Sequence, residues 1–285
     1  TWKDNSFETL KKFEHTANFG ASFFFPRGRK KGNPMSAFSL YRMIMNVPNV
    51  AKELETAGMR IVIGDDFAAY RLLRNAQHDR APIYPMFDVA SSYVDKSNAF
   101  WICGFNEQDE LVHTQAMRLL DLSGMTLGQH MNTHRHKYIT PNSTPDPDRT
   151  FYRRPMALEK ITGKVVYHGE FWLKDGENGN RSKGFPPLLS RIAFEMALTT
   201  WVPNYCFGFI RTPLASKGMP LRYGYTHCEP GSWYGPDAQI TDEDCIVWMN
   251  TKEMVHLLKT PAQALSDERE IPTLRSTVQP FSVVA

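Results

Sequence analysis

Residues 165–210 read VVYHGEFWLKDGENGNRSKGFPPLLSRIAFEMALTTWVPNYCFGFI, and this stretch decides the fold class. It begins with an apolar strand that runs to about Asp175 and continues into a polar, glycine-rich loop. Pro186 and Pro187 then open a helix, where a missing backbone N–H is well tolerated. A second apolar strand follows at 205–210, so the order strand, loop, helix, strand predicts an α/β domain.

The glycine-rich loop at 176–184 is a candidate phosphate-binding loop. Its backbone N–H groups come directly before a helix N-terminus, and Arg181 and Lys183 add positive charge. No Gly-Lys-Ser/Thr ends the loop, which excludes a P-loop. The pattern G-x-G-x-x-G is absent and a hairpin precedes the loop, which disfavours a dinucleotide-binding fold.

Upstream of this unit the sequence predicts a strand, a helix and a hairpin. Residues 59–63 form a short apolar strand, and two Asp residues follow that can cap a helix from Phe67 to about Gln77. Apolar runs at 100–105 and 111–122 flank five polar residues, which is typical of a hairpin.

The remaining segments are weaker in pattern. Residues 36–57 have helical spacing that we expect Pro48 to break, and residues 123–163 look irregular. Downstream we expect a short helix at 214–217 and strands near 221–227 and 245–249. The expected organisation is an N-terminal extension, one large domain and a C-terminal tail, with the bounds 1–58, 59–260 and 261–285.

Composition excludes several functional classes. A net charge of +3 does not build the broad positive field of a nucleic-acid-binding protein, and the basic run at 27–31 is expected to be a solvated loop. No stretch has the roughly 18 to 20 apolar residues of a membrane span. The polar N-terminus and four separated cysteines favour a reducing cytoplasm.

From residue 59 to about residue 250, the order of elements resembles the GNAT superfamily of N-acyltransferases. In that family a loop of the form Arg/Gln-x-x-Gly-x-Gly/Ala binds the pyrophosphate of coenzyme A, and the matching stretch here is Arg181-Ser-Lys-Gly184-Phe-Pro186. The resemblance implies a mixed, mostly antiparallel central sheet flanked by helices. It implies direct acyl transfer from acyl-CoA, such as acetyl-CoA, to an amine of a small-molecule acceptor.

Pro186 departs from that motif and leaves the donor open, because it removes one N–H. The acyl-homoserine-lactone synthases share the GNAT fold, lack the glycine loop and use acyl-carrier protein. Residues 88–120 are weakly similar to them, with a hairpin that ends in Met117-Arg-Leu-Leu120. A carrier-protein-dependent amino-acid N-acyltransferase and a non-catalytic thioester-binding module are therefore the alternatives.

Site residues follow from strand alternation and from the resemblance. Alternation along 165–174 places Val166, His168, Glu170 and Trp172 on one face, which makes Glu170 the candidate base and His168 its alternative. The resemblance implies a tyrosine that protonates the leaving thiolate, and Tyr225 or Tyr223 lies in the matching region. A core tyrosine with a bonded hydroxyl is the alternative for each.

The donor would meet two sets of residues if the resemblance holds. Backbone groups of β-strand residues would pair with the pantetheine arm, and the loop would hold the phosphates. The cofactor-binding candidates are Phe171, Trp172, Leu173, Arg181, Ser182, Lys183, Gly184 and Phe185.

His130, His134 and His136 have a spacing that suits Zn²⁺ on a helix, but a polar loop with surface histidines is the expectation, with no metal. This insertion is also a candidate acceptor-binding loop, together with charged residues at Asp146, Asp148, Arg153 and Arg154.

The turn aromatics Trp233 and Tyr234 would either line an acceptor pocket or cover the core. Edge strands in such a fold allow a homodimer.

Overall fold

The computed structural model describes residues 37–138, 149–153, 155–174, 184–235 and 244–260. The helices and strands follow in this order: α2 (Ala37–Thr56), β1 (Arg60–Gly64), α3 (Phe67–Asn75), β2 (Ala99–Phe105), β3 (Leu111–Leu122), α4 (Leu127–Thr133), the 3-10 turn η1 (Arg135–Lys137), β4 (Phe151–Arg153), the 3-10 turn η3 (Met156–Glu159), β5 (Gly163–Leu173), α5 (Phe185–Trp201), β6 (Tyr205–Arg211), α6 (Thr212–Ala215), α7 (Met219–Arg222), β7 (His227–Glu229), β8 (Ser232–Tyr234), β9 (Asp244–Asn250) and α8 (Thr251–Lys259).

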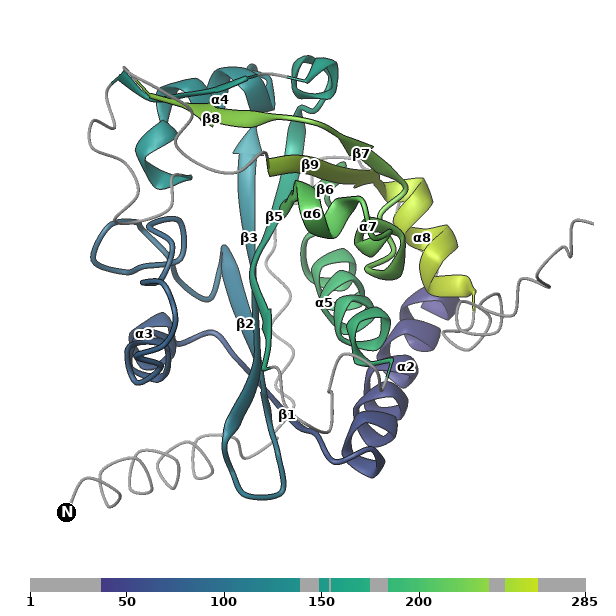
Figure 1. The fold of residues 1–285 in the computed structure, drawn as a ribbon. Helices are drawn as coiled ribbons and strands as arrows, with labels where there is room; N and C mark the ends of the chain where they lie inside the picture. The colour runs from purple at the N-terminus through teal and green to yellow at the C-terminus, as the bar shows by residue number, and fades with distance from the viewer. Residues whose placement is uncertain (1–36, 139–148, 154, 175–183, 236–243, 261–285) are drawn as a thin grey trace, which may run out of the picture. The chain divides into compact units, whose positions relative to one another are not determined.

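Seven of the described strands form one sheet in the order β1-β2-β3-β5-β6-β9-β7, and β4 pairs with β8 in a separate two-stranded sheet (Figure 1). Every neighbouring pair in the large sheet is antiparallel except β5 and β6, which are parallel. The helix α5 connects these two strands, as a crossover between parallel strands requires. The expected mixed, mostly antiparallel sheet is confirmed.

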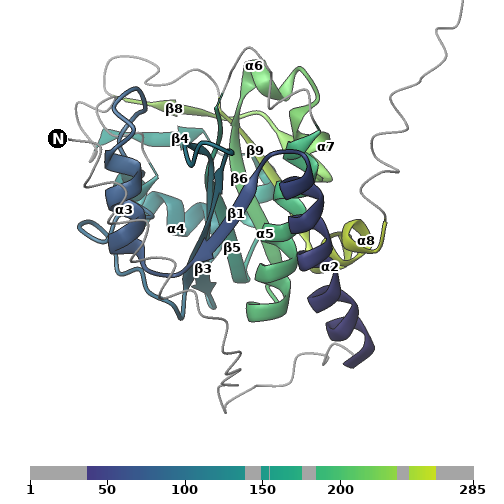
Figure 2. The ribbon, with the colours of Figure 1, turned by 90° about the horizontal axis from the view of Figure 1, so that it is seen from below.

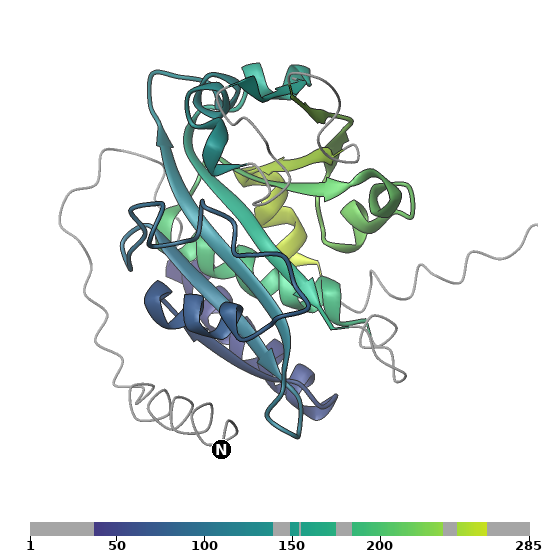
Figure 3. The same cartoon turned by 60° about the vertical axis from the view of Figure 1, so that its left-hand side comes forward.

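Helices cover both faces of the sheet. On one face lie α3 and the segment 76–98, and on the other lie α5, α8 and α2 (Figures 2 and 3). On the α3 face, Tyr70 stacks on Trp101 of β2 with ring centroids 5.8 Å apart. On the α5 face, the side-chain amide of Gln115 on β3 donates to the Leu189 carbonyl at 2.8 Å. The strand β2, next to the edge strand β1, is buried along its whole length, as its apolar sequence predicts.

Several local expectations are confirmed. Asp66 caps α3, because its carboxylate accepts from the N–H groups of Ala68 and Ala69 at 2.9 and 3.1 Å. The helix after the glycine-rich loop carries its prolines in the first turn. The hairpin β2–β3 has the expected bounds within two residues.

Three expectations are corrected. The helix α2 continues through Pro48 instead of ending there. The segment 123–163 is not wholly irregular, because Thr126 and Gln129 form a capping box that begins α4. Residues 219–222 are helical, so the expected strand near 221–227 reduces to β7. Among the described residues, no helix is both long and apolar enough to cross a membrane.

Candidate functional site

The strands β5 and β6 diverge soon after they begin. Three register pairs join them, the last between Tyr167 and Phe207, and no further pair joins the two strands in the described part of the chain. The divergence leaves the facing edges of β5 from His168 onward and of β6 from Gly208 onward without sheet partners. We call this opening the β5–β6 wedge. A glycine is needed at its apex, since a Cβ on Gly208 would lie 2.9 Å from the His168 carbonyl oxygen.

A β-bulge interrupts β5 at the wedge. Ala116 pairs with Gly169 and Thr114 with Trp172, so two residues of β5 oppose one residue of β3. Glu170 takes the extra position in the left-handed region, with φ of 57°. Strand alternation reverses there, because one inserted residue shifts every later side chain to the other face.

The bulge corrects the expectation that His168, Glu170 and Trp172 share a face. His168 points to the α5 face, where its ring lies 5.4 Å from that of Phe194. Glu170 points to the α3 face, where it contacts Arg74. The predicted acid and base residues thus separate into two clusters, one on each face of the sheet.

On the α5 face, His168 is the centre of a hydrogen-bond chain. The Gln115 amide group donates to Leu189, so its oxygen faces His168 Nε2 at 2.9 Å. An amide oxygen only accepts, so the neutral ring carries its proton on Nε2. His168 Nδ1 then accepts from the Tyr225 hydroxyl at 2.9 Å. The Cys206 thiol lies 3.9 Å from the same hydroxyl.

Burial keeps this chain uncharged at neutral pH. It lowers the pKa of His168 to about 3, so the imidazole is neutral. It raises the pKa of Tyr225 well above its usual value, so the phenol keeps its proton. The pair can therefore give or accept hydrogen bonds beside the wedge without carrying a charge into it.

Tyr223, the second predicted acid, lies across the wedge from β5. Its ring contacts that of Phe171 with centroids 4.6 Å apart, and Phe171 in turn lies 5.8 Å from the His168 ring. Two of the predicted residues, one catalytic and one cofactor-binding, thus meet as an aromatic pair beside the His168–Tyr225 hydrogen bond.

On the α3 face, the Glu170 carboxylate is enclosed. One oxygen accepts from Arg74 Nε at 2.5 Å, and the other accepts from the backbone N–H of Tyr84 at 2.9 Å. The Tyr70 hydroxyl lies 3.4 Å away, and the side chain of Glu170 is 1% exposed. Both carboxylate oxygens therefore have hydrogen-bond partners within the fold, which hold the group in place.

The donor-binding candidates are only partly described. Arg181, Ser182 and Lys183 lie outside the described residues. Gly184 is the N-cap of α5, with φ of 75°, and the next residue, Phe185, is buried. Pro186 and Pro187 have no N–H, so the first turn of α5 offers few donors to an anion. Leu173 pairs with His113 of β3.

The histidine cluster is helical and not a loop. His130 and His134 lie one turn apart on and just after α4, with ring centroids 4.6 Å apart. Burial lowers the pKa of His130 to about 4. Within the described ranges, no group of three or more His, Cys, Asp or Glu side chains is arranged to hold a metal ion.

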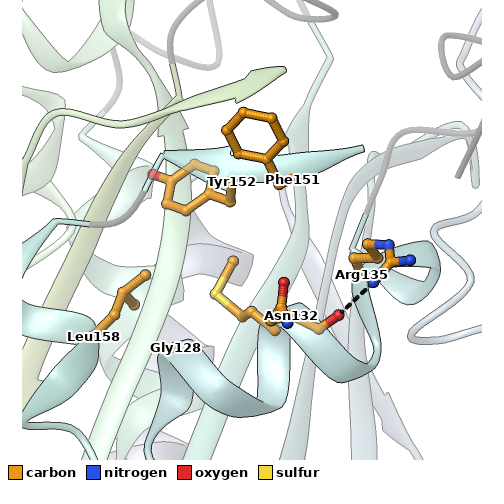
Figure 4. A pocket seen from close by; sticks show the side chains of 7 residues that line it. Gly128, Asn132, Arg135, Phe151, Tyr152 and Leu158 are labelled. Carbon is orange, nitrogen blue, oxygen red and sulfur yellow. Dashed lines mark hydrogen bonds between the residues drawn. The ribbon is translucent and has the colours of Figure 1, made fainter. Parts of the chain in front are cut away.

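A cavity of about 210 Å³ lies beside α4 and β4 (Figure 4). Its lining combines apolar and polar side chains and consists of Gly128, Met131, Asn132, Arg135, Phe151, Tyr152 and Leu158. Arg135 donates to the Asn132 carbonyl at 3.0 Å. No lining residue belongs to β5 or β6, and the volume is below the roughly 300 Å³ of a small-molecule site.

Trp233 and Tyr234 lie on the strand β8 and not on the expected turn. Trp233 is buried and its ring lies 5.0 Å from that of Tyr152, so it covers the core. Tyr234 stacks on the half-exposed Phe151 at 5.7 Å, at the rim of the cavity. Arg153 is the last residue of β4 and pairs with Ser232 of β8, while Asp146, Asp148 and Arg154 lie outside the described residues.

Sequence reasoning missed the residues that complete both clusters. Arg74 and Arg80 were not singled out, because each is one of several charged residues around the helix at 67–77. Gln115 lies in the middle of a predicted strand, where an amide side chain was the available signal.

No protein-family model matches the sequence, and no curated protein matches it. Solved structures do match, at low identity. FeeM, an N-acyl amino acid synthase from uncultured soil microbes, is 12% identical, with 68% of this chain and 94% of that chain covered and a TM-score of 0.37.

The aminoglycoside acetyltransferase AAC(6')-Ib, in complex with coenzyme A and kanamycin, is 10% identical, with 69% and 98% covered and a TM-score of 0.36. TofI in an apo form is 15% identical, with 72% and 99% covered and a TM-score of 0.35. Similarities of this size carry no argument about activity. The chain has a mixed α/β fold with a mostly antiparallel sheet, and the roles of its residues follow from their own contacts.

Proposed function

We propose that this chain is an N-acyltransferase that moves an acyl group directly from an acyl thioester, in the first place acyl-CoA, to the amine of a small-molecule acceptor. The observation that carries the proposal is the β5–β6 wedge with the His168–Tyr225 pair beside it. An extended arm with amide groups can pair with an unpaired strand edge, as an added strand would. A thioester at the end of such an arm would then lie near an uncharged hydrogen-bond donor.

The reaction needs few groups. The neutral amine nitrogen attacks the thioester carbonyl carbon, the new C–N bond forms, and the C–S bond breaks. The sulfur leaves with the electron pair and takes up a proton, and the nitrogen loses one. No covalent bond to the enzyme is required.

The geometry favours particular roles for the predicted residues. We assign proton donation to the leaving sulfur to Tyr225. Its one hydroxyl proton, which His168 Nδ1 accepts in the structure, passes to the sulfur, and the proton that the amine nitrogen loses restores the phenol. His168 is a positioning residue in this assignment, because its Nδ1 is the acceptor that orients the phenol. Glu170 remains a predicted base, but its ion pair with Arg74 favours a positioning role.

The thioester donor is either acyl-CoA or an acylated carrier protein. Pro186 and Pro187 remove N–H groups from the first turn of α5, where the pyrophosphate of coenzyme A is expected. That feature keeps open the alternatives, a carrier-protein thioester used by an amino-acid N-acyltransferase or a non-catalytic thioester-binding module. A cytoplasmic location and a homodimer remain predictions.

The test is calorimetric titration with acetyl-CoA, on the wild type and on Arg181→Ala. Micromolar binding that the substitution weakens tenfold or more supports acyl-CoA as donor. A thiol-release assay with acetyl-CoA and a panel of primary amines, on the wild type and on Tyr225→Phe, then tests transfer. Absence of binding by the wild type refutes acyl-CoA, and the same assay with an acylated carrier protein decides the alternative.

A further inference from the structure

The Arg80 side chain lies beside the bulge of β5 without a full set of partners. Its guanidinium carbon lies 4.2 Å from the centroid of the Trp172 ring, and its Nη2 lies 4.0 Å from Glu170 Oε2. The side chain is only 10% exposed. Its Nη1 atom is buried and has no hydrogen-bond partner in the described structure. Buried polar atoms without partners are uncommon in native proteins.

The surroundings of Arg80 carry an excess positive charge. The groups that act on it electrostatically are Arg74, Glu170, Tyr70 and Cys103. Burial raises the pKa values of Tyr70 and Cys103, so both are neutral. Two guanidinium groups therefore share the single carboxylate of Glu170, and Arg74 holds it at 2.5 Å. The pKa of Arg80 is lowered to about 10 by burial and by Arg74, which leaves it charged at neutral pH.

A buried cation without its own anion destabilises a protein unless a ligand supplies the charge. We propose that Arg80 and the Trp172 ring form a subsite for a carboxylate that is carried by the acceptor amine. Stacking of the planar guanidinium on the indole leaves Nη1 without a hydrogen-bond partner, and carboxylates fit the N–H edge of a guanidinium. The inference rests on the proposed acyl transfer and adds the substrate class, an amino acid or a similar amino carboxylate.

The position of Arg80 favours the acceptor over the donor. Arg80 and Glu170 lie on the α3 face, whereas α5, whose N-terminus would meet the donor phosphates, lies on the opposite face. The Trp172 carbonyl accepts from His113 Nδ1 at 2.7 Å, so this part of β5 is fixed. An amine anchored through its carboxylate at Arg80 would approach the bulge from the side away from the donor.

The experiment compares thermal unfolding of the wild type and of Arg80→Met with phenylacetate and with phenylacetamide, at equal ionic strength. We expect phenylacetate to raise the wild-type Tm by about 3 °C at ten times its Kd. We expect phenylacetamide to raise it less, and Arg80→Met to lose the difference. Arg80→Met without ligand should keep or raise its Tm, because it removes an uncompensated charge.

Arg60→Met is the matched control. Arg60 also lies over an aromatic ring, Phe105 at 5.2 Å, and pairs with one carboxylate, but it is 39% exposed. The Arg60→Met variant should keep the rise in Tm that phenylacetate causes in the wild type. Arg80→Lys keeps the charge without the planar fork, and we expect it to retain only part of the shift.

Equal shifts by phenylacetate in the wild type and in Arg80→Met overturn the proposal. So does a tenfold loss of coenzyme A affinity in Arg80→Met, measured by calorimetry, because the cation would then serve the donor. Neither readout depends on turnover. If phenylacetate raises the wild-type Tm through Arg80 but no acyl transfer is detected, the carboxylate subsite stands and the proposed acyltransferase function is refuted.

Discussion

Replacing Arg74 with Met should destabilise the fold strongly, because it leaves the Glu170 carboxylate buried without its closest cation. The pair is 2.5 Å apart, and the two side chains are 4% and 1% exposed. Removing one partner of a buried pair costs about 3–5 kcal/mol. Arg80 lies 4.0 Å from the same oxygen and offsets part of that loss. We therefore expect a loss of about 3 kcal/mol in the free energy of unfolding.

Glu170→Gln tests the same contact from the other side, since it removes the charge and keeps an acceptor for the Tyr84 N–H. If the pair is responsible, the double variant Arg74→Met/Glu170→Gln should be more stable than the sum of the single losses predicts. A coupling of about 2 kcal/mol is expected for groups in direct contact. Urea unfolding followed by fluorescence gives all four free energies.

The exposed pair Arg60–Asp109 is the control, with an N–O distance of 2.7 Å and side chains 39% and 48% exposed. Breaking it should cost less than about 1 kcal/mol. The reasoning fails if Arg74→Met costs no more than this control, or if the two substitutions at Arg74 and Glu170 are additive.

Other expectations follow from the wedge and from the buried histidines. Tyr225→Phe should lower kcat/KM for acyl transfer about 100-fold in a thiol-release assay, while Tyr223→Phe, which keeps its ring contact, should change it less than about threefold. Burial lowers the pKa values of His113 and His168 to about 3, so the unfolded chain binds two more protons between pH 6.5 and 3. The free energy of unfolding should decrease by up to about 2.7 kcal/mol for each unit by which the pH is lowered through that window. His168→Asn should halve this slope, measured by urea unfolding at each pH. Gly208→Ala places a Cβ 2.9 Å from the His168 carbonyl and should weaken acetyl-CoA binding measured by calorimetry, whereas an unchanged affinity would place the donor elsewhere.

The fold followed from the sequence where periodicity and end signals agree. The strand β5 and the helix α5 differ from the expected bounds by no more than two residues, because an apolar run, a glycine-rich loop and two prolines mark their ends. The helix α4 was missed, because short capped helices depend on a capping box such as Thr126 and Gln129 more than on apolar spacing.

The site was less predictable, for a local reason. The alternation rule that placed His168 and Glu170 together fails at a β-bulge, and Gly169 inside the strand is the signal in the sequence that could have indicated it. The partners of each group come from segments 53 to 96 positions away, such as Gln115 for His168 and Arg74 for Glu170. Sequence spacing carries no information about such contacts.

The hydrogen-bond chain from Leu189 through Gln115 and His168 to Tyr225 has a mechanical consequence. Each bond is 2.8 or 2.9 Å long and has a fixed direction, so the chain behaves as a short linkage with its anchor on α5. Tyr225 is thereby tied to α5 through His168 on β5 and Gln115 on β3, so its position depends on how the helix packs against these strands. A small displacement of α5 against the sheet would strain this chain of hydrogen bonds. A ligand bound at the N-terminal end of α5 would therefore also change the orientation of the Tyr225 hydroxyl.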